Sequence, residues 1–194
     1  MSCFHCPLRG YPGIMKSQDD IGVVGNHKSY QDIDLRTACA GDLAELQSID
    51  AEAFGTLAYP AFVLRQFFDV HHDSLLVAAH PDGLRGYSLG VPTADRRQGW
   101  LLALAVRREH RGRGYGRALT SATLALLRSY GVRTAYLTVA PENTAAVALY
   151  RSVGFTVRSE AKDYLGAGQD RMIMTYDFPV NGQSSGFADS HKRS

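Results

Sequence analysis

The chain has 194 residues and a formal net charge of +2, and 45% of its residues are hydrophobic and 21% charged. This length and composition predict one soluble globular domain and exclude fibrous, membrane-spanning and disulfide-rich classes. The net charge is too small to indicate nucleic-acid binding, and no segment approaches the roughly 18 apolar residues of a membrane span.

The two ends of the chain are expected to be flexible arms. Residues 1–31 and 179–194 are poor in core-forming residues and show no sustained hydrophobic period. Cys3 and Cys6 flank His5, but no second ligand pair at metal-site spacing follows, so no bound metal is expected. The odd cysteine count and the lack of a signal peptide favour the cytoplasm.

The domain between the arms, residues 32–178, begins with a short strand at 33–37. A helix is predicted next, with Asp42 as its N-cap and with apolar residues at helical spacing: Leu43, Leu46, Ile49 and Phe54. A second helix starts at Pro60 and carries an apolar side formed by Phe62, Val63, Phe67 and Val70. Strands at 75–79 and 84–91 flank a Pro-Asp-Gly turn, which is typical of a hairpin.

The second half alternates strands and helices. An apolar strand at 100–106 precedes a glycine-rich turn and a helix at 114–130, expected to bury Ala118, Leu119, Ala122 and Leu126. A strand at 133–140, a helix at 144–152 and two strands at 155–161 and 172–178 complete the pattern. This order predicts an α+β fold with a mixed sheet and a central β-α-β unit.

The glycine-rich turn has the character of an anion site. Gly112, Gly114 and Gly116 alternate with other residues directly before a helix, so successive backbone N–H groups can face one point beside the positive helix end. Five arginines surround it: Arg107, Arg108, Arg111, Arg113 and Arg117. The lysine and hydroxyl of a P-loop are absent, the dinucleotide fingerprint lacks its third glycine, and a single ordered segment is untypical of an RGG nucleic-acid motif.

Two motifs together resemble the GNAT superfamily of N-acetyltransferases. The first is Leu104-Ala105-Val106 followed four residues later by Arg111-Gly112-Arg113-Gly114-Tyr115-Gly116, and the second runs from Asn143 through Tyr150 to Gly154-Phe155. Within the superfamily the chain is most similar to the ribosomal-protein alanine N-acetyltransferases, through Ala53-Phe54, Asp163-Tyr164 and Met172-Ile173-Met174. The resemblance implies a mostly antiparallel mixed sheet flanked by helices, and acetyl-CoA as co-substrate.

The resemblance also implies where the donor would bind. The strand before the turn would separate from its neighbour, with Leu104 and Ala105 along the pantetheine arm and the Val106 N–H facing the thioester carbonyl. Backbone N–H groups of the segment Arg111, Gly112, Arg113, Gly114, Tyr115, Gly116 and Arg117 would bind the pyrophosphate. Asn143 would contact the pantetheine arm, although an N-cap for the following helix is an equally physical role for this residue.

Tyr150 matches the superfamily's general acid. A phenol keeps its proton at neutral pH and so suits protonation of a leaving thiolate, while the competing interpretation is a core tyrosine packed on Phe155. In the ribosomal-protein acetyltransferases that this chain resembles, a glutamate acts as the general base, and Thr138 stands at that position here. Glu52, His71 and His72 are the remaining candidates, and none is assigned.

The acceptor is left open between two classes of amine. Tyr59 and Tyr164 are expected to wall the acceptor site, and likeness to the ribosomal-protein enzymes favours a protein N-terminus or lysine. Leu165 stands where a second tyrosine would hold a peptide, which favours a small-molecule amine such as an antibiotic, polyamine or amino acid. A non-catalytic acyl-CoA-binding module is a third possibility, and no membrane or nucleic-acid partner is expected of this monomer or homodimer.

Overall fold

The computed structural model describes residues 33–179. Apart from Pro179, both predicted arms and the Cys3–Cys6 segment lie outside the described residues. The long helices are α1 (Leu43–Phe54), α2 (Ala61–His71), α3 (Tyr115–Ser129) and α4 (Thr144–Val153). The strands are β1 (Asp34–Thr37), β2 (Leu75–His80), β3 (Gly83–Pro92), β4 (Gln98–Val106), β5 (Thr134–Val139), β6 (Thr156–Ala161) and β7 (Arg171–Asp177).

The seven strands form one mostly antiparallel sheet in the order β1-β2-β3-β4-β5-β7-β6, so the predicted α+β fold is confirmed. The parallel pair is β4 with β5, which are the two strands of the β-α-β unit. Their register joins Gln98–Leu101 to Thr134–Leu137, so the last five residues of β4 lie beyond this pairing. Among the described residues no helix is long and apolar enough to cross a membrane.

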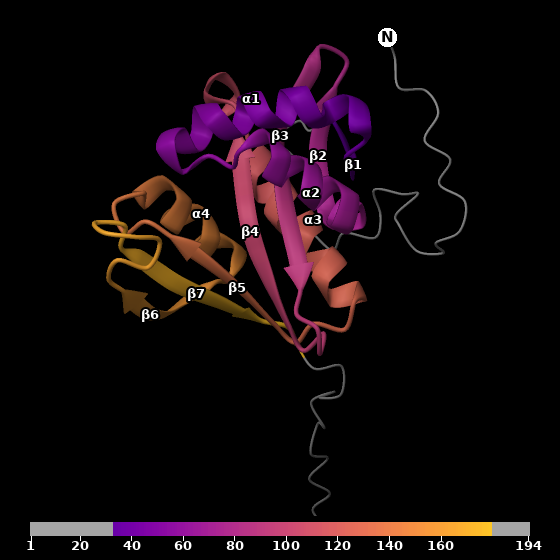
Figure 1. The fold of residues 1–194 in the computed structure, drawn as a ribbon. Coiled ribbons are helices and arrows are strands. Elements are labelled where there is room, and N and C mark those ends of the chain that lie inside the picture. Colours follow the sequence, from indigo (N-terminus) through magenta and orange to yellow (C-terminus); the bar gives the residue numbers. More distant parts are fainter. Residues whose placement is uncertain (1–32, 180–194) are drawn as a thin grey trace, which may run out of the picture. The chain divides into compact units, whose positions relative to one another are not determined.

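The described residues cluster into two compact units. The first holds residues 33–89 and 103–122, and the second holds residues 90–102 and 123–179. In the first unit β1, β2 and β3 pair antiparallel, and α1 contacts α2 (Figure 1). Its fully buried apolar side chains include Leu46, Ile49, Leu75, Val77, Tyr87, Leu89 and Leu119.

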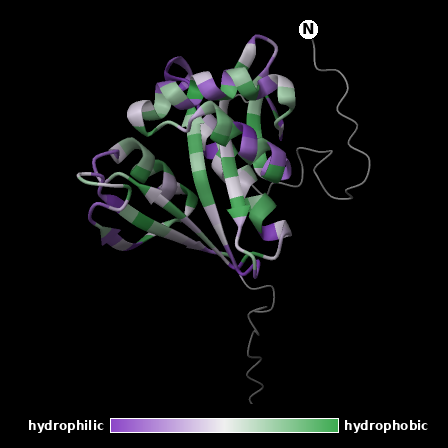
Figure 2. Ribbon diagram, viewed as in Figure 1, coloured by the Kyte–Doolittle hydropathy of each residue, from purple (hydrophilic) through white to green (hydrophobic). Residues whose placement is uncertain are grey.

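In the second unit β7 lies between β5 and β6 and is antiparallel to both (Figure 1). The core here contains Leu127, Ala135, Leu137, Phe155 and Met174. The indole of Trp100 on β4 stacks on the ring of Tyr136 on β5, with ring centroids 5.1 Å apart. Arg158 of β6 then donates to the Tyr136 hydroxyl at 2.7 Å. Polar and exposed residues dominate β6, whereas β2 and β3 are mainly apolar (Figure 2).

Three packing predictions were wrong in detail. The apolar side predicted for α2 is not its core face, because Phe62 is 66% exposed and Val70 is 70% exposed, while Leu64 is the buried residue of this helix. On α3, Leu119 is buried as expected, but Ala118, Ala122 and Leu126 are half-buried, and Thr120, Thr123, Leu124 and Leu127 complete the core face.

The third concerns Asp42, which stands at the N-cap position of α1 but does not cap the helix. Its carboxylate accepts two bonds from Arg36, at 2.7 and 3.0 Å, and one from the Cys39 amide at 2.7 Å. Burial alone would raise the pKa of Asp42, yet these bonds outweigh it and lower the pKa below its ordinary value. Asp42 therefore fastens β1 to the turn before α1.

Candidate active site

The glycine-rich turn of residues 111–116, which we call the cradle, has the backbone geometry of an anion-binding site. Gly112 and Gly114 adopt φ angles of 74° and 89°, a region that favours glycine over residues with a side chain. The first helical hydrogen bond of α3 runs from the Ala118 N–H to the Gly114 carbonyl at 3.0 Å. The N–H groups of Tyr115 and Gly116 precede that bond, so helix geometry leaves them available to a ligand.

The room beside this turn suits a diphosphate. No atom lies within 4 Å of the position that a Cβ on Gly112 would occupy, so the turn is open at that point. The guanidinium-bearing residues Arg111, Arg113 and Arg117 are all exposed around it. Oriented amides, a helix N-terminus and nearby cations together favour an anionic ligand such as a diphosphate.

The end of β4 is tightly fitted to β3. A Cβ on Gly86 would stand 2.5 Å from the Ala105 carbonyl oxygen and 3.2 Å from Val106 Cα, so this close approach requires glycine. Ala105 is buried, and Leu104 and Val106 are half-buried. The Arg111 side chain folds back and donates from Nε to the Val106 carbonyl at 3.1 Å, which joins the strand end to the cradle.

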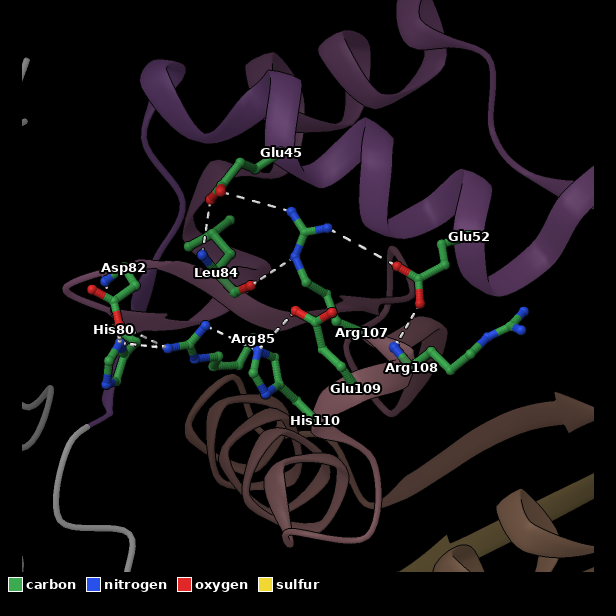
Figure 3. A network of polar contacts seen from close by, with 10 residues as sticks. All are labelled: Glu45, Glu52, His80, Asp82, Leu84, Arg85, Arg107, Arg108, Glu109 and His110. Atoms are coloured by element: carbon green, nitrogen blue, oxygen red, sulfur yellow. Dashed lines mark hydrogen bonds and ion pairs between the residues drawn. The ribbon is translucent and has the colours of Figure 1, made fainter.

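The carboxylate candidate for a general base is already engaged. Glu52 accepts the Arg108 amide at 2.6 Å and faces the Arg107 guanidinium, in the polar network that Figure 3 shows around the turn. His71 ends α2, and the exposed His72 ring lies 2.9 Å from the Asp73 carboxylate. Thr138 is half-buried on β5. These placements support no assignment of a base.

A buried carboxylate, Asp50 on α1, was missed by the sequence analysis. It accepts the Tyr87 hydroxyl through one oxygen and the Tyr59 amide, at 2.5 Å, through the other. Burial raises the pKa of Asp50, and both bonds oppose that rise. Asp50 lies four residues after the buried Leu46 and next to the buried Ile49, so its position on the core face was the available signal.

Asp50 thereby fixes the backbone that carries Tyr59. The Tyr59 ring packs edge-on against Phe67 of α2, with centroids 5.1 Å apart. Burial, and then the Asp50 charge, raise the pKa of Tyr59 above its ordinary value. Phe54, Leu57 and Phe62, which are near Tyr59 in the chain, have exposed side chains, so the segment that joins α1 to α2 presents apolar and aromatic residues to solvent.

Tyr150 lies on α4 and is almost fully buried. Its ring meets Phe155 in a T-shaped contact with centroids 5.8 Å apart. Burial raises the pKa of its hydroxyl well above 10, so the group keeps its proton throughout the neutral range. Within residues 33–179 the one buried side-chain polar atom without a partner is His110 Nδ1, so the Tyr150 hydroxyl is not stranded in the core.

Asn143 and Tyr164 lie in the second unit, at the start of α4 and in the loop between β6 and β7. The Asn143 side chain accepts the Ala146 amide at 3.2 Å, so its predicted N-cap role is confirmed. Tyr164 and Leu165 are 44% and 51% exposed in the loop between β6 and β7. That loop is ordered by Asp163, whose carboxylate accepts the Gly168 amide at 2.6 Å.

The predicted site residues therefore divide between the two units. Tyr59, the end of β4 and the whole cradle belong to the first unit, where bonds join the strand end to the turn. Asn143, Tyr150 and Tyr164 belong to the second. Among the described residues no cluster of metal-ligating side chains is found.

Comparison with known proteins identifies a family. The sequence model of the Acetyltransferase (GNAT) family matches residues 42–155. An uncharacterized N-acetyltransferase of Methanocaldococcus jannaschii is 30% identical over 145 residues, which are 72% of this chain and 88% of that protein. A mycothiol acetyltransferase of Thermobispora bispora is 42% identical over 97 residues, or 50% of this chain, which spans only 32% of that relative.

Among solved structures, the ribosomal-protein-S18-alanine N-acetyltransferase of Escherichia coli superposes with a TM-score of 0.65. The match covers 78% of this chain and 97% of that one at 22% sequence identity. At this identity the likeness concerns the fold alone.

Proposed function

Because the chain belongs to the acetyltransferase (GNAT) family, we propose that it is an N-acetyltransferase that moves an acetyl group from acetyl-CoA to a primary amine. The observation that carries the proposal is the cradle, where positive-φ glycines lead directly into the N-terminus of α3. Such a turn binds a diphosphate through backbone amides, and the family supplies the donor that bears one.

The transfer step needs an electrophile, a neutral amine and a proton for the leaving group. The amine nitrogen attacks the thioester carbonyl carbon, the C–S bond breaks, and the thiolate sulfur takes a proton from the Tyr150 hydroxyl, which is later reprotonated from solvent. The Val106 N–H donates to the carbonyl oxygen as negative charge develops on it. The amine loses its surplus proton to solvent, and no side chain is assigned to that role.

Burial sharpens the role of Tyr150. Because its pKa is raised, the phenol is a weaker acid than free tyrosine, while a thiol has an ordinary pKa near 8.5. Tyr150 therefore acts mainly by donating a strong hydrogen bond to the sulfur as charge develops there, with proton transfer completed as the thiolate leaves.

For the acceptor we favour a protein N-terminus or a lysine side chain. The apolar surface at Phe54, Leu57 and Phe62 supports an acceptor with side chains beyond the reacting amine, and the exposed Tyr164 on an ordered loop offers a hydrogen-bonding phenol. The predicted location of this reaction is the cytoplasm.

A small-molecule amine is the alternative acceptor. Two observations favour it: Leu165 is an exposed apolar residue at the place of a second tyrosine, and Thr138 leaves β5 without a carboxylate. The relatives include mycothiol acetyltransferases, which are named for a small molecule.

An acceptor screen with intact-mass detection tests the proposal. The protein and acetyl-CoA are incubated with a library of peptides bearing free N-termini or lysines, and in parallel with polyamines, amino acids and aminoglycosides. We expect a mass gain of one acetyl group on peptides, with free CoA released in equal amount. Turnover confined to small amines would select the alternative acceptor.

A second measurement separates catalysis from donor binding alone. Calorimetric titration with acetyl-CoA shows whether the donor binds, independently of any acceptor. Tight donor binding without turnover on either library would indicate a non-catalytic acyl-CoA-binding module. Absence of donor binding would refute the cradle itself.

A further inference from the structure

The short turn between β4 and the cradle, Arg108–His110, is held at both ends by charged side chains (Figure 3). It directly precedes the segment Arg111–Gly116, whose amides are proposed to bind the donor. The backbone position of this turn therefore sets the direction in which those amides point.

Arg107 holds the entrance of the turn. Its amide donates to the Arg85 carbonyl at 3.0 Å, and its Nε donates to the Leu84 carbonyl at 3.0 Å. The two terminal nitrogens then face carboxylates on α1, with 3.7 Å to Glu45 and 4.0 Å to Glu52. Arg107 thus joins three elements, β3, β4 and α1, through one side chain that is mostly buried.

Glu52 extends the same link onto the turn itself. Its Oε1 accepts the Arg108 amide at 2.6 Å, while Oε2 is the oxygen that faces Arg107. One carboxylate thereby fixes the first residue of the turn and the cation beside it, and an ionised acceptor makes the amide bond stronger than a neutral one. Glu45 fastens α1 to β3 in a parallel way, because it accepts the Leu84 amide at 2.8 Å.

The exit of the turn is held from β3 by Arg85. This guanidinium donates to His110 Nε2 at 2.9 Å and to His80 Nδ1 at 2.6 Å. Because a guanidinium can only donate, His110 Nε2 and His80 Nδ1 are the acceptors of these two bonds. The turn is thus pinned at Arg108 from α1 and at His110 from β3.

We infer that Arg107 and Glu52 are positioning residues for donor binding: they hold the Arg108–His110 turn so that the cradle amides are already aimed before acetyl-CoA arrives. This inference rests on the proposed function, because it assumes that the cradle binds the donor. A turn released from α1 would have to be ordered during binding, and that ordering costs affinity without any lost contact to the ligand.

Calorimetric titration with acetyl-CoA, alongside thermal unfolding, tests the role of Glu52. Glu52→Ala removes the acceptor of the Arg108 amide, and we expect the Kd to rise about 5- to 20-fold, the effect of ordering about one more backbone residue on binding. Glu52→Gln keeps an acceptor oxygen, so its Kd should stay within about threefold of the wild-type value. An equal loss in both variants, or a loss in neither, would overturn the positioning role.

Arg107→Met and the double variant Glu52→Ala/Arg107→Met test whether Arg107 and Glu52 hold the same turn. If both hold the same turn, the double variant binds acetyl-CoA about as weakly as the weaker single variant, and the two effects do not multiply. Multiplying effects would show independent actions and overturn the inference. If Arg107→Met does not fold, Arg107→Lys replaces it, since it keeps the charge but loses the Nε bond to Leu84.

Arg65→Ala on α2 is the matched control. Arg65 forms an exposed ion pair with Asp69 at 2.8 Å in the same unit, far along the chain from the turn. This variant should change neither Kd nor melting temperature appreciably. Wild-type protein that fails to bind acetyl-CoA would refute the proposed function, whereas wild-type binding with unchanged Kd in Glu52→Ala and Arg107→Met would refute only the positioning inference.

Discussion

The cradle and the surroundings of Tyr150 present their proposed functional atoms in opposite ways. In the cradle the atoms proposed to bind the donor are backbone amides, and charged side chains hold the turn before them: Glu45, Glu52, Arg85 and Arg107. At Tyr150 the proposed functional atom belongs to a side chain, and an aromatic neighbour, Phe155, packs against its ring. Charge fixes the first region, and apolar burial fixes the second.

This difference predicts different sensitivities to substitution. A side chain in the cradle can be changed with a moderate effect, because the amides remain, but a change of backbone conformation alters every donor at once. At Tyr150 the reverse holds, because removal of one hydroxyl deletes the functional group and leaves the backbone of α4 unchanged. Substitutions in and around the two regions test this contrast.

Tyr150→Phe is expected to lower kcat by about 10²- to 10⁴-fold, the usual contribution of a positioned acid. The Kd for acetyl-CoA should stay within about twofold, because the variant keeps the ring contact with Phe155. Steady-state kinetics with an acceptor from the screen and calorimetric titration measure the two quantities. An active enzyme with unchanged kcat would remove Tyr150 from the mechanism.

Asp50→Ala tests how much a buried polar contact in the first unit, which also contains the cradle, contributes to stability. The buried Tyr87 hydroxyl and the partly buried Tyr59 amide lose their acceptor, and an unsatisfied buried group costs about 1–3 kcal/mol. Urea denaturation should therefore show a loss of about 2–4 kcal/mol in the free energy of unfolding. Asp69→Ala, on the exposed surface of α2, should cost less than about 0.5 kcal/mol. Equal losses of stability in Asp50→Ala and Asp69→Ala would contradict a stabilising role for the two hydrogen bonds that Asp50 accepts.

Gly114→Val tests the cradle backbone directly. At a φ of 89°, a β-branched residue costs about 1–3 kcal/mol or forces the turn to change, so acetyl-CoA affinity should fall by at least about tenfold. Gly131 provides a matched control, because its φ is 87° and it lies just after α3 with open space beside it. Gly131→Val should destabilise the fold similarly yet leave the affinity for acetyl-CoA within about twofold. A similar loss of affinity in both glycine variants would show that backbone strain anywhere in the fold weakens binding, and would contradict a specific role for the cradle.

His110 gives the smallest expected effect, a dependence of stability on pH. Burial, and then the positive charge of Arg85, lower the pKa of His110; Arg107 and Arg113 act in the same direction and Glu109 opposes them. The folded state therefore favours the neutral ring. That contribution to stability is complete above the ordinary pKa of 6.5 and is lost as the pH falls from there through the lowered value.

His110→Gln keeps an acceptor for Arg85 but does not titrate, so it isolates the pH-dependent contribution of His110 to the free energy of unfolding. The stability of the wild type relative to His110→Gln, from urea denaturation on either side of pH 6.5, should decrease on acidification. A difference that stays constant or increases with falling pH would contradict the lowered pKa.

Much of the fold could be predicted, because its elements carry local signals. The bounds of α1, α4 and β4–β7 fall within two residues of the predicted ranges, since glycines and polar turn residues end each periodic segment. The cradle could also be located, because glycines that alternate with other residues before a helix predict an anion-binding turn from the sequence alone.

What failed depends on contacts that are distant in sequence. Phe62 and Val70 lie on an apolar stripe, but Leu64 is the α2 residue that is buried, and periodicity alone could not choose between the two sides. Asp50 is buried because Tyr87, 37 residues later, supplies its donor. The network around Arg107 likewise joins α1 to a turn 56 residues away through Glu52 and the Arg108 amide.

The stack at Trp100 gives the protein a built-in optical reporter. Trp100 is the only tryptophan of the chain, it lies on β4, and its ring faces Tyr136 at the paired end of β5. All indole emission therefore originates at one strand pair, four residues from Leu104. Changes in tryptophan fluorescence during unfolding or donor titration can thus be read as local events at β4 and β5, without any added label.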